Sequence, residues 1–229
     1  MEIQALKQIL QENGIVGAGG AGFPTYAKLD KRADIILMNC AECEPLLKLH
    51  RQLLEQHCEE ILNIFDGIAR TVGAKEAVIG IKREYKAAVK AIDRYIDAYP
   101  NMRIQLLDSA YPMGDEVVLI YEATGRVIRP GGLPIEEGVA VFNVETLYNA
   151  YRALEQQTPV MDKLVTVVGE VEHPVKVRVP IGASIGDVVS CAGGIRVKDP
   201  AYLVGGPMMG NLATEDDVVT KTTNAVIVL

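Results

Sequence analysis

The sequence predicts an α/β fold with a mostly parallel sheet and flanking helices, followed by a smaller α+β domain. Up to about residue 155, short apolar runs alternate with segments of helical periodicity, which is typical of parallel strands joined by helices. From residue 163 onward, short strands with alternating polarity are separated by turn residues. Gln156-Gln-Thr-Pro159 lies between the two patterns, so we expect one domain over 1–157 and a second over 160–229.

Hydrophobic spacing, glycine and proline predict the elements of the first domain. Residues 2–13 place Ile3, Leu6 and Leu10 on one helical face, and Asn13-Gly14 ends that helix. Apolar residues recur at helical spacing over 46–72, which predicts one long helix that ends at Gly73. The other expected strands are 33–38, 77–81, 103–107 and 138–143, and the other expected helices are 84–98, 115–123 and 145–155.

The second domain is predicted from shorter segments. Strands are expected over 164–168 and 175–179, with turns at His173-Pro174 and Pro180-Ile-Gly182. One small helix is expected over 184–192, and residues 224–229 resemble part of another strand.

The composition excludes several classes of protein. The 229 residues are 49% hydrophobic and 23% charged, which suits a chain with a buried core rather than a disordered one. A net charge of −7 lacks the basic footprint that nucleic acid or an anionic membrane surface requires. The apolar stretches are shorter than the ~20 residues that span a bilayer. The charged, amphipathic N-terminus is not typical of a signal peptide.

Cys40, Cys43, Cys58 and Cys191 are too few and too scattered for a disulfide framework. This indicates a reducing cytoplasm. Only Cys40 and Cys43 have the close spacing of metal ligands, so no metal site is predicted. A redox or metal-binding role of this pair remains the alternative to small buried side chains.

Gly17-Ala-Gly-Gly-Ala-Gly22 matches the G-x-G-x-x-G pattern of dinucleotide sites. That pattern is informative after a strand and before a helix, whereas here a helix precedes it and Phe23-Pro24 follows. We therefore reject an ordinary Rossmann site. Four glycines in six residues still expose amide donors for an anion or a flat ring, and a tight turn without a ligand is the alternative.

Polar motifs follow three of the predicted strands: Asn39-Cys-Ala-Glu-Cys-Glu-Pro45, Tyr111-Pro-Met-Gly-Asp-Glu116 and Asn143-Val-Glu-Thr146. Because parallel strands end at the same edge of a sheet, these motifs could form one site. A structural alternative is that Asn39 and Glu42 cap the long helix.

Two other features have structural interpretations. His50 and His57 are expected on the long helix, facing solvent or packed, and outside the strand-end motifs. Met208-Met209 is expected to fill core, although a flexible contact for a ligand or partner is the alternative.

Taken together and in order, these motifs resemble two families. The first family is the flavin- and NADH-binding subunit of respiratory NADH:quinone oxidoreductase. The second is the NADH-oxidising C subunit of the Rnf complex. The resemblance rests on Gly17–Thr25 with Lys28, Asn39-x-x-Glu42-x-Glu44-Pro45, Tyr111-x-x-Gly114-x-Glu116 and Asn143-Val-Glu-Thr146. Residues 39–47, 50–54 and 111–118 look most similar to the cobalamin reductases of propanediol-utilisation microcompartments. From about Lys163, including Gly205-Gly-Pro-Met-Met-Gly210, the chain looks like a soluble ligand-binding β-grasp (SLBB) domain.

The resemblance implies flavin mononucleotide (FMN) and NADH as cofactors, with hydride passing from nicotinamide C4 to flavin N5. Glu44 and Glu116 would contact the nicotinamide side as the catalytic pair, and Phe23 would help NADH to stack. Lys28 would lie near the FMN phosphate or ring, the alternative being a solvated loop lysine. The remaining implied cofactor residues are Gly17, Gly19, Gly20, Asn39, Glu42, Tyr111, Gly114, Asp115 and Asn143.

The sequence also departs from the respiratory pattern. Ala18 replaces an arginine of the glycine-rich flavin loop, and Ala41 replaces an acidic residue after the first-strand asparagine. Both changes remove polar contacts to the cofactors. Arg129 stands where a cationic, nucleotide-contacting residue is expected.

The function implied is NADH oxidation by a flavin domain, with electrons passing through iron–sulfur clusters to cob(III)alamin or cob(II)alamin. A non-catalytic scaffold that binds cobalamin or a partner is the alternative. Relatives continue into a cysteine-rich segment that holds two four-iron clusters, so we expect a fragment with partial activity and clusters only in a longer chain. Expected partners are NADH, a corrinoid or corrinoid adenosyltransferase and other microcompartment proteins. The expected location is the cytoplasm or the interior of a bacterial microcompartment.

Overall fold

The structure is a computed structural model that describes all 229 residues. It divides into two compact units, which are described separately. The first unit comprises Met1–Val16, Phe23–Cys43 and His50–Pro159. The second comprises Gly17–Gly22, Glu44–Leu49 and Val160–Leu229. Two short segments from the N-terminal part of the chain therefore belong with the C-terminal unit.

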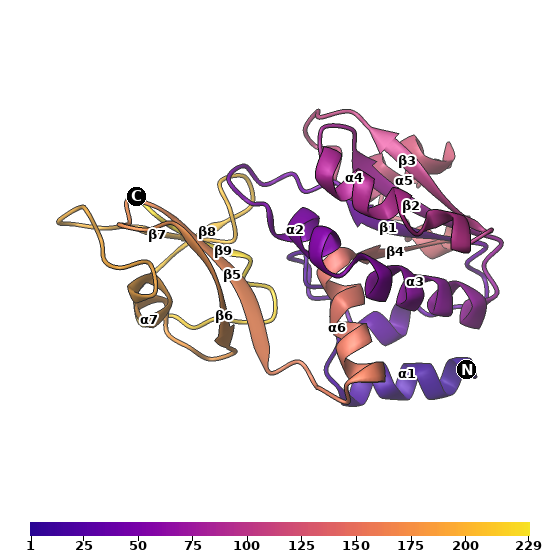
Figure 1. The fold of residues 1–229 in the computed structure, drawn as a ribbon, viewed down its shortest axis with the longest axis horizontal. Coiled ribbons are helices and arrows are strands. Elements are labelled where there is room, and N and C mark those ends of the chain that lie inside the picture. Colours follow the sequence, from indigo (N-terminus) through magenta and orange to yellow (C-terminus); the bar gives the residue numbers. More distant parts are fainter. The chain divides into compact units, whose positions relative to one another are not determined.

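The first unit is built on a four-stranded sheet in the order β3-β2-β1-β4 (Figure 1). The strands are β1 (Ile35–Cys40), β2 (Glu76–Lys82), β3 (Met102–Leu107) and β4 (Val139–Asn143). All three pairings are parallel, so the predicted α/β class is confirmed. The chain leaves β1 towards β2 and returns to pair β4 on the other side of β1. This reversal makes the carboxyl ends of β1 and β4 the topological switch point, where such sheets bind ligands.

Helices cover both faces of this sheet. Leu37 of β1 packs with Val78, Val141 and Leu119 beneath α5 (Glu116–Thr124). Side chains alternate along a strand, so Ile36 and Met38 point to the opposite face. Figure 1 shows the remaining large helices below the sheet. They are α1 (Ile3–Glu12), α3 (Cys58–Val72) and α6 (Val144–Glu155), while α2 (Leu49–Gln56) precedes α3 in the chain.

The helix ends follow from local chemistry. The Asp115 carboxylate accepts hydrogen bonds from the backbone N–H groups of Val117 and Val118 and so caps α5. Gly73 ends α3 and Gly125 ends α5 with left-handed φ values of 82° and 72°, which glycine adopts without steric cost.

Two predicted helices are interrupted. The single helix expected over 46–72 is wrong, because α2 and α3 are separated at His57, which has φ −132° and ψ 36°. The His57 ring packs on Tyr148 at 4.5 Å between centroids, and Glu59 begins an acidic first turn suited to a new helix N-terminus. The helix expected over 84–98 is α4 (Lys86–Asp93) followed by a 3₁₀ turn over Ile96–Ala98. Two further 3₁₀ turns, Thr25–Lys28 and Pro134–Glu137, lie where no helix was predicted.

The second unit holds a five-stranded mixed sheet in the order β6-β5-β9-β7-β8. The strands are β5 (Asp162–Gly169), β6 (Val175–Pro180), β7 (Tyr202–Val204), β8 (Asn211–Ala213) and β9 (Ala225–Val228). Only β5 and β9 pair in parallel. Helix α7 (Ile185–Ser190) buries Ile185, Val188 and Val189 in the core of this unit. The predicted strands at 164–168, 175–179 and 224–229 and the predicted small helix are confirmed, while β7 and β8 were not foreseen.

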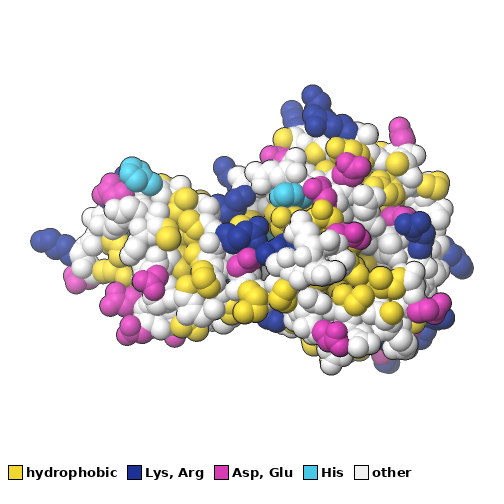
Figure 2. Space-filling view, turned by 60° about the horizontal axis from the view of Figure 1, so that its bottom comes forward, with side chains coloured by type: hydrophobic (Ala, Val, Ile, Leu, Met, Phe, Trp, Pro, Cys, Tyr) yellow, Lys and Arg dark blue, Asp and Glu magenta, His cyan; other side chains and the backbone are white.

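The molecular surface mixes charged and apolar side chains. Figure 2 shows basic, acidic and hydrophobic side chains interspersed over the face that it draws. None of the helices combines the length and hydrophobicity that crossing a membrane demands.

Candidate functional site

Asn39 lies near the carboxyl end of β1 and links two loops. Its Nδ2 donates to the Gly114 carbonyl oxygen at 2.9 Å, and its Oδ1 accepts from the Ala41 N–H at 3.1 Å. The alternative in which Asn39 caps the long helix is wrong, because α2 begins only at Leu49 and the carboxamide is engaged elsewhere. Asn39 therefore joins the first polar motif to the second.

Gly114 interlocks with the same loop from the other side. Its N–H donates to the Cys43 Sγ at 2.8 Å. A Cβ at this position would collide with the Ala41 carbonyl oxygen and would lie 3.0 Å from the Cys43 Sγ. Only glycine fits this close approach, so the β1 loop and the Tyr111–Glu116 loop are packed backbone against backbone.

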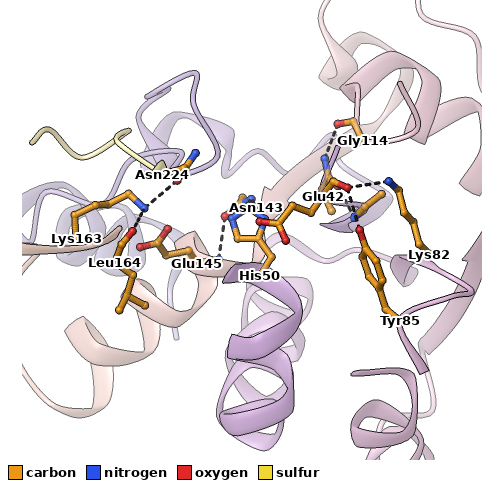
Figure 3. A network of polar contacts seen from close by, with 12 residues as sticks. Glu42, His50, Lys82, Tyr85, Gly114, Asn143, Glu145, Lys163, Leu164 and Asn224 are labelled. Carbon is orange, nitrogen blue, oxygen red and sulfur yellow. Dashed lines mark hydrogen bonds and ion pairs between the residues drawn. The ribbon is translucent and has the colours of Figure 1, made fainter. Parts of the chain in front are cut away.

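Glu42 is fixed through its backbone. Its carbonyl oxygen accepts from Lys82 Nζ at 2.8 Å and from the Tyr85 hydroxyl at 3.0 Å (Figure 3). Its carboxylate is buried, with an Oε1 3.9 Å from His50 Nδ1. Sequence reasoning did not identify Lys82 or Tyr85. The position of Lys82 at the end of a predicted parallel strand was the signal that could have found it.

Asn143 is the last residue of β4 and the N-cap of α6. Its Oδ1 accepts from the Glu145 N–H at 2.9 Å, while its Nδ2 lies 3.3 Å and 3.4 Å from the two ring nitrogens of His50. The prediction that no histidine lies among the strand-end motifs is therefore wrong for His50, which is buried between the first and the third motif. The error follows from the helix prediction, because His50 lies in the first turn of α2 rather than inside a long helix.

Lys28 forms a second set of contacts at this edge of the sheet. Its Nζ donates to Glu116 Oε1 at 3.2 Å and to the Val141 carbonyl oxygen at 2.8 Å, and it lies 5.8 Å from the centroid of the Phe23 ring. The alternative of a merely solvated loop lysine is wrong. Lys28 connects the segment after the glycine loop to β4 and to the first turn of α5.

Two aromatic side chains of the candidate set remain uncovered. Phe23 is 46% exposed and Tyr111 is 55% exposed, although large apolar groups are normally buried. Such side chains can stack against a planar ligand. Arg129, by contrast, forms an exposed ion pair with Glu136 at 3.0 Å, which lowers the pKa of the Glu136 carboxyl.

The glycine loop and Glu44 are part of the second unit. The Gly22 N–H donates to the Gly17 carbonyl oxygen at 3.1 Å and closes a tight turn. Gly20 has φ +128°, and a Cβ there would meet no atom within 4 Å, so its backbone borders open space. Gly19 lies between Gly17 and Gly20 in the same turn.

Glu44 holds a second glycine-rich loop within that unit. Its Oε2 accepts from the Met208 N–H at 2.9 Å, and its Oε1 accepts from the Met209 N–H at 2.8 Å. Met208 and Met209 are 47% and 78% exposed, so the prediction that they fill core is wrong. The backbone amides of Met208 and Met209 point towards the Glu44 carboxylate, while their side chains lie on the surface.

The cysteines are all free. Burial raises the pKa of the Cys40 thiol well above its ordinary value and that of Cys58 to about 12. Both therefore stay protonated and unreactive near neutral pH. No three His, Cys, Asp or Glu side chains are grouped closely enough to hold one metal ion.

The residues of the first unit fit a phosphate-bearing aromatic cofactor. One edge of its sheet carries the Lys28 ammonium, the N-termini of α5 and α6 and the exposed Tyr111 ring. Cations and helix N-termini bind phosphate, and exposed aromatic rings stack on planar groups.

The comparisons with known proteins define the class to which this fold belongs. Residues 10–152 match the Nuo51 FMN-binding domain, and the chain belongs to this family. Residues 164–212 match the SLBB domain. The predicted FMN-binding α/β fold followed by an SLBB domain is confirmed.

Individual relatives narrow the class. The chain is 42% identical to "Cobalamin reductase PduS" of Citrobacter freundii, over 100% of this chain and 50% of that protein. It is 31% identical to the C subunit of the Na(+)-translocating ferredoxin:NAD(+) oxidoreductase complex of Acetobacterium woodii, over 100% of this chain and 53% of that protein. The suspected relationships are confirmed, and the chain spans about half the length of these relatives.

A solved structure shares the whole fold. A chain of an NAD+-reducing nickel–iron hydrogenase, crystallised in the air-oxidised state, matches with a TM-score of 0.83 and 27% identity. The match covers 100% of this chain and 47% of the other. Together with the family match, this supports a flavin-based electron-transfer role among the flavoprotein oxidoreductases.

Proposed function

We propose that this chain is the NADH-oxidising FMN portion of a cobalamin reductase. The observation that carries the proposal is the convergence of three polar motifs at the switch point of a parallel sheet, in a chain 42% identical to a cobalamin reductase over its full length. FMN, when bound, supplies an acceptor for the hydride of NADH. In a longer chain, iron–sulfur clusters would carry the electrons on to a corrinoid.

The residues have separate tasks in this proposal. Lys28 and the N-terminus of α6, capped by Asn143, would hold the phosphate of FMN, with Asp115 shaping the neighbouring turn of α5. Asn39, Glu42 and Gly114 would fix the loop that borders the ring, and Tyr111 would cover it. Gly17, Gly19 and Gly20 would give the cofactor close access to backbone amides.

Phe23, Glu44 and Glu116 are the residues that we propose to contact nicotinamide. Phe23 offers an exposed ring for stacking. Glu116 is held by Lys28 at 3.2 Å, and Glu44 is held by two backbone amides, so both carboxylates are oriented before any ligand binds. Preorganised groups of this kind align a nicotinamide for hydride transfer.

The test is cofactor retention followed by reduction. The purified chain is incubated with FMN and desalted, and its visible spectrum is recorded before and after NADH is added without oxygen. The proposal predicts a retained flavin band that bleaches with NADH, and NADH oxidation with ferricyanide as artificial acceptor. If the chain retains no FMN after desalting and NADH bleaches no flavin band, the flavin function is overturned.

Two matched pairs of variants test the site itself. Gly20→Ala and Gly182→Ala both place a Cβ in open space at positive φ, and only Gly20→Ala is expected to weaken FMN binding. Glu116→Gln and Glu122→Gln both neutralise a carboxylate of α5, and only Glu116→Gln is expected to slow NADH oxidation. Equal effects of Gly20→Ala and Gly182→Ala would exclude Gly20 from the site. Equal effects of Glu116→Gln and Glu122→Gln would exclude Glu116.

The second candidate is a non-catalytic scaffold that binds cobalamin or a partner protein. The exposed Met208 and Met209 of the SLBB unit favour a binding role for that unit. Retention of a corrinoid by a chain that binds no FMN would support the scaffold.

The cellular setting of the proposed reductase is part of the same hypothesis. Its partners would be NADH, a corrinoid or a corrinoid adenosyltransferase, and other microcompartment proteins. Its place would be the cytoplasm or the interior of a bacterial microcompartment. Copurification of the full-length protein with an adenosyltransferase from a microcompartment preparation, and iron in that protein, would test these points.

A further inference from the structure

We infer that Lys82 and Tyr85 are a positioning pair for the flavin site, and that the Lys82 ammonium supplies a fixed positive charge beside it. The inference rests on the proposed function, because the site in question is the FMN site at the carboxyl ends of β1 and β4. Neither residue belongs to the motifs that suggested the site.

The two side chains reach one atom from different elements. Lys82 is the last residue of β2, which runs parallel to β1 with Ile81 opposite Cys40. Tyr85 immediately precedes α4. Lys82 Nζ and the Tyr85 hydroxyl donate to the Glu42 carbonyl oxygen at 2.8 Å and 3.0 Å, as Figure 3 shows. A carbonyl oxygen has two lone pairs, so this pair saturates it and fixes the backbone of the β1 loop.

The Lys82 charge is buried and donates to a neutral carbonyl oxygen rather than directly to a carboxylate. Lys82 is 7% exposed, and no carboxylate oxygen lies within 4.0 Å of its Nζ. Its other contact is the Tyr85 ring, whose centroid is 5.9 Å away. Burial of an ammonium that is not bonded directly to a carboxylate is costly, and an apolar side chain would occupy this position at lower cost. A positive charge here would favour the more negatively charged, reduced form of a flavin held at the same loop.

Tyr85 remains a hydrogen-bond donor at physiological pH. Burial is the main cause that raises the pKa of its phenol to about 12, and the negative charge of Glu42 adds to the shift. The Arg51 guanidinium lies 4.5 Å from the centroid of its ring and holds the ring in place. The hydroxyl therefore stays aimed at the Glu42 carbonyl.

Four single variants separate the two roles. Tyr85→Phe removes one donor but keeps the ring, and we expect about 3- to 10-fold weaker FMN binding, as for the loss of a neutral hydrogen bond. Lys82→Met removes a charged donor, and we expect about 10- to 100-fold weaker binding and a lower midpoint potential of the bound flavin. Lys82→Arg retains the charge and should recover most of the potential. Lys90→Met removes an exposed charge from α4 and serves as the control.

The experiment measures FMN affinity by fluorescence titration and the flavin midpoint potential by spectroelectrochemistry, in full-length chains checked by circular dichroism. If Lys82→Met and Lys90→Met shift the potential equally, the charge role is overturned. If Tyr85→Phe and Lys82→Met both bind FMN as the wild type does, the positioning role is overturned. If the wild type itself binds no FMN, the proposed function fails and this inference fails with it.

Discussion

The two sheets of this protein place their polar side chains differently. In the first unit every strand pairing is parallel, so Asn39, Lys82 and Asn143 reach the same edge from three different strands. In the second unit β9 pairs in parallel with β5 and antiparallel with β7, so carboxyl ends lie at both edges. The all-parallel arrangement brings the polar residues at its strand ends to one edge of the sheet. In a mixed sheet such as that of the second unit, the strand ends are divided between two edges, so a binding site has to be built from loops.

The buried lysines show the same contrast. Lys163 of the second unit, 1% exposed, donates to Asn224 Oδ1 at 2.9 Å and to its neighbour's carbonyl at 3.2 Å (Figure 3). Its contacts tie β5 to the residue before β9. Lys82 instead fixes a loop at the candidate site. A buried cation therefore joins strands in one sheet and orders a loop of the candidate site in the other.

The largest expected loss of stability is for Gly169→Ala in the second unit. Gly169 has φ +95°, and an added Cβ would collide with the Val228 carbonyl oxygen. We expect a loss of about 3 kcal/mol or more, from backbone strain and overpacking together. Gly182→Ala, at φ +93° in open space, carries only the strain, about 1 kcal/mol. Urea unfolding followed by circular dichroism measures both, and equal losses would show that the β5–β9 contact is not tight.

The corresponding change in the first unit is Gly114→Ala. Its Cβ would collide with the Ala41 carbonyl oxygen, so we expect a loss of about 2 kcal/mol together with loss of FMN binding. Gly67→Ala, within α3 and with nothing within 4 Å, should gain about 0.5–1 kcal/mol. A Gly114→Ala chain that binds FMN like the wild type would contradict a site at the parallel-strand ends.

A smaller effect is expected for Glu44→Gln, which acts on a loop of the second unit. The variant loses the charge that accepts from the Met208 and Met209 amides, and we expect a cost of about 1 kcal/mol. The 205–210 loop should become more sensitive to limited proteolysis with proteinase K. Glu55→Gln, on an exposed position of α2, is the control. Unchanged cleavage would show that the carboxylate does not order the loop.

The smallest effect is a pH dependence at the surface of the first unit. Hydrogen bonds from Arg32 lower the pKa of Asp30 from 3.8 to about 2. Because the folded-state pKa is depressed, this stabilisation is present above about pH 4 and is lost as the pH falls towards 2. Asp30→Asn should therefore lose less stability than the wild type over that interval. Urea midpoints at pH 4, 3 and 2 measure the difference, and parallel declines would exclude the ion pair as a contributor.

Much of the fold was predictable because its signals are local. Apolar runs such as 77–81 identified strands, and Gly73 identified a helix end, from a few neighbouring residues. The break at His57 was not predictable from spacing, because the same apolar periodicity continues across it. At the break the His57 ring packs on Tyr148 of α6, a helix much later in the chain.

The sequence by itself determined the fold class, the polar motifs and the family resemblance, since these depend on residue order and spacing. Tertiary structure alone decided that His50, Lys82 and Tyr85 join those motifs, because their contacts with Asn143 and Glu42 require strands and helices brought together by parallel pairing. It also decided that Glu44 holds the Met208-Met209 loop, a contact between residues more than one hundred and sixty positions apart. Contacts at such separations depend on the packed chain and leave no periodicity in the sequence.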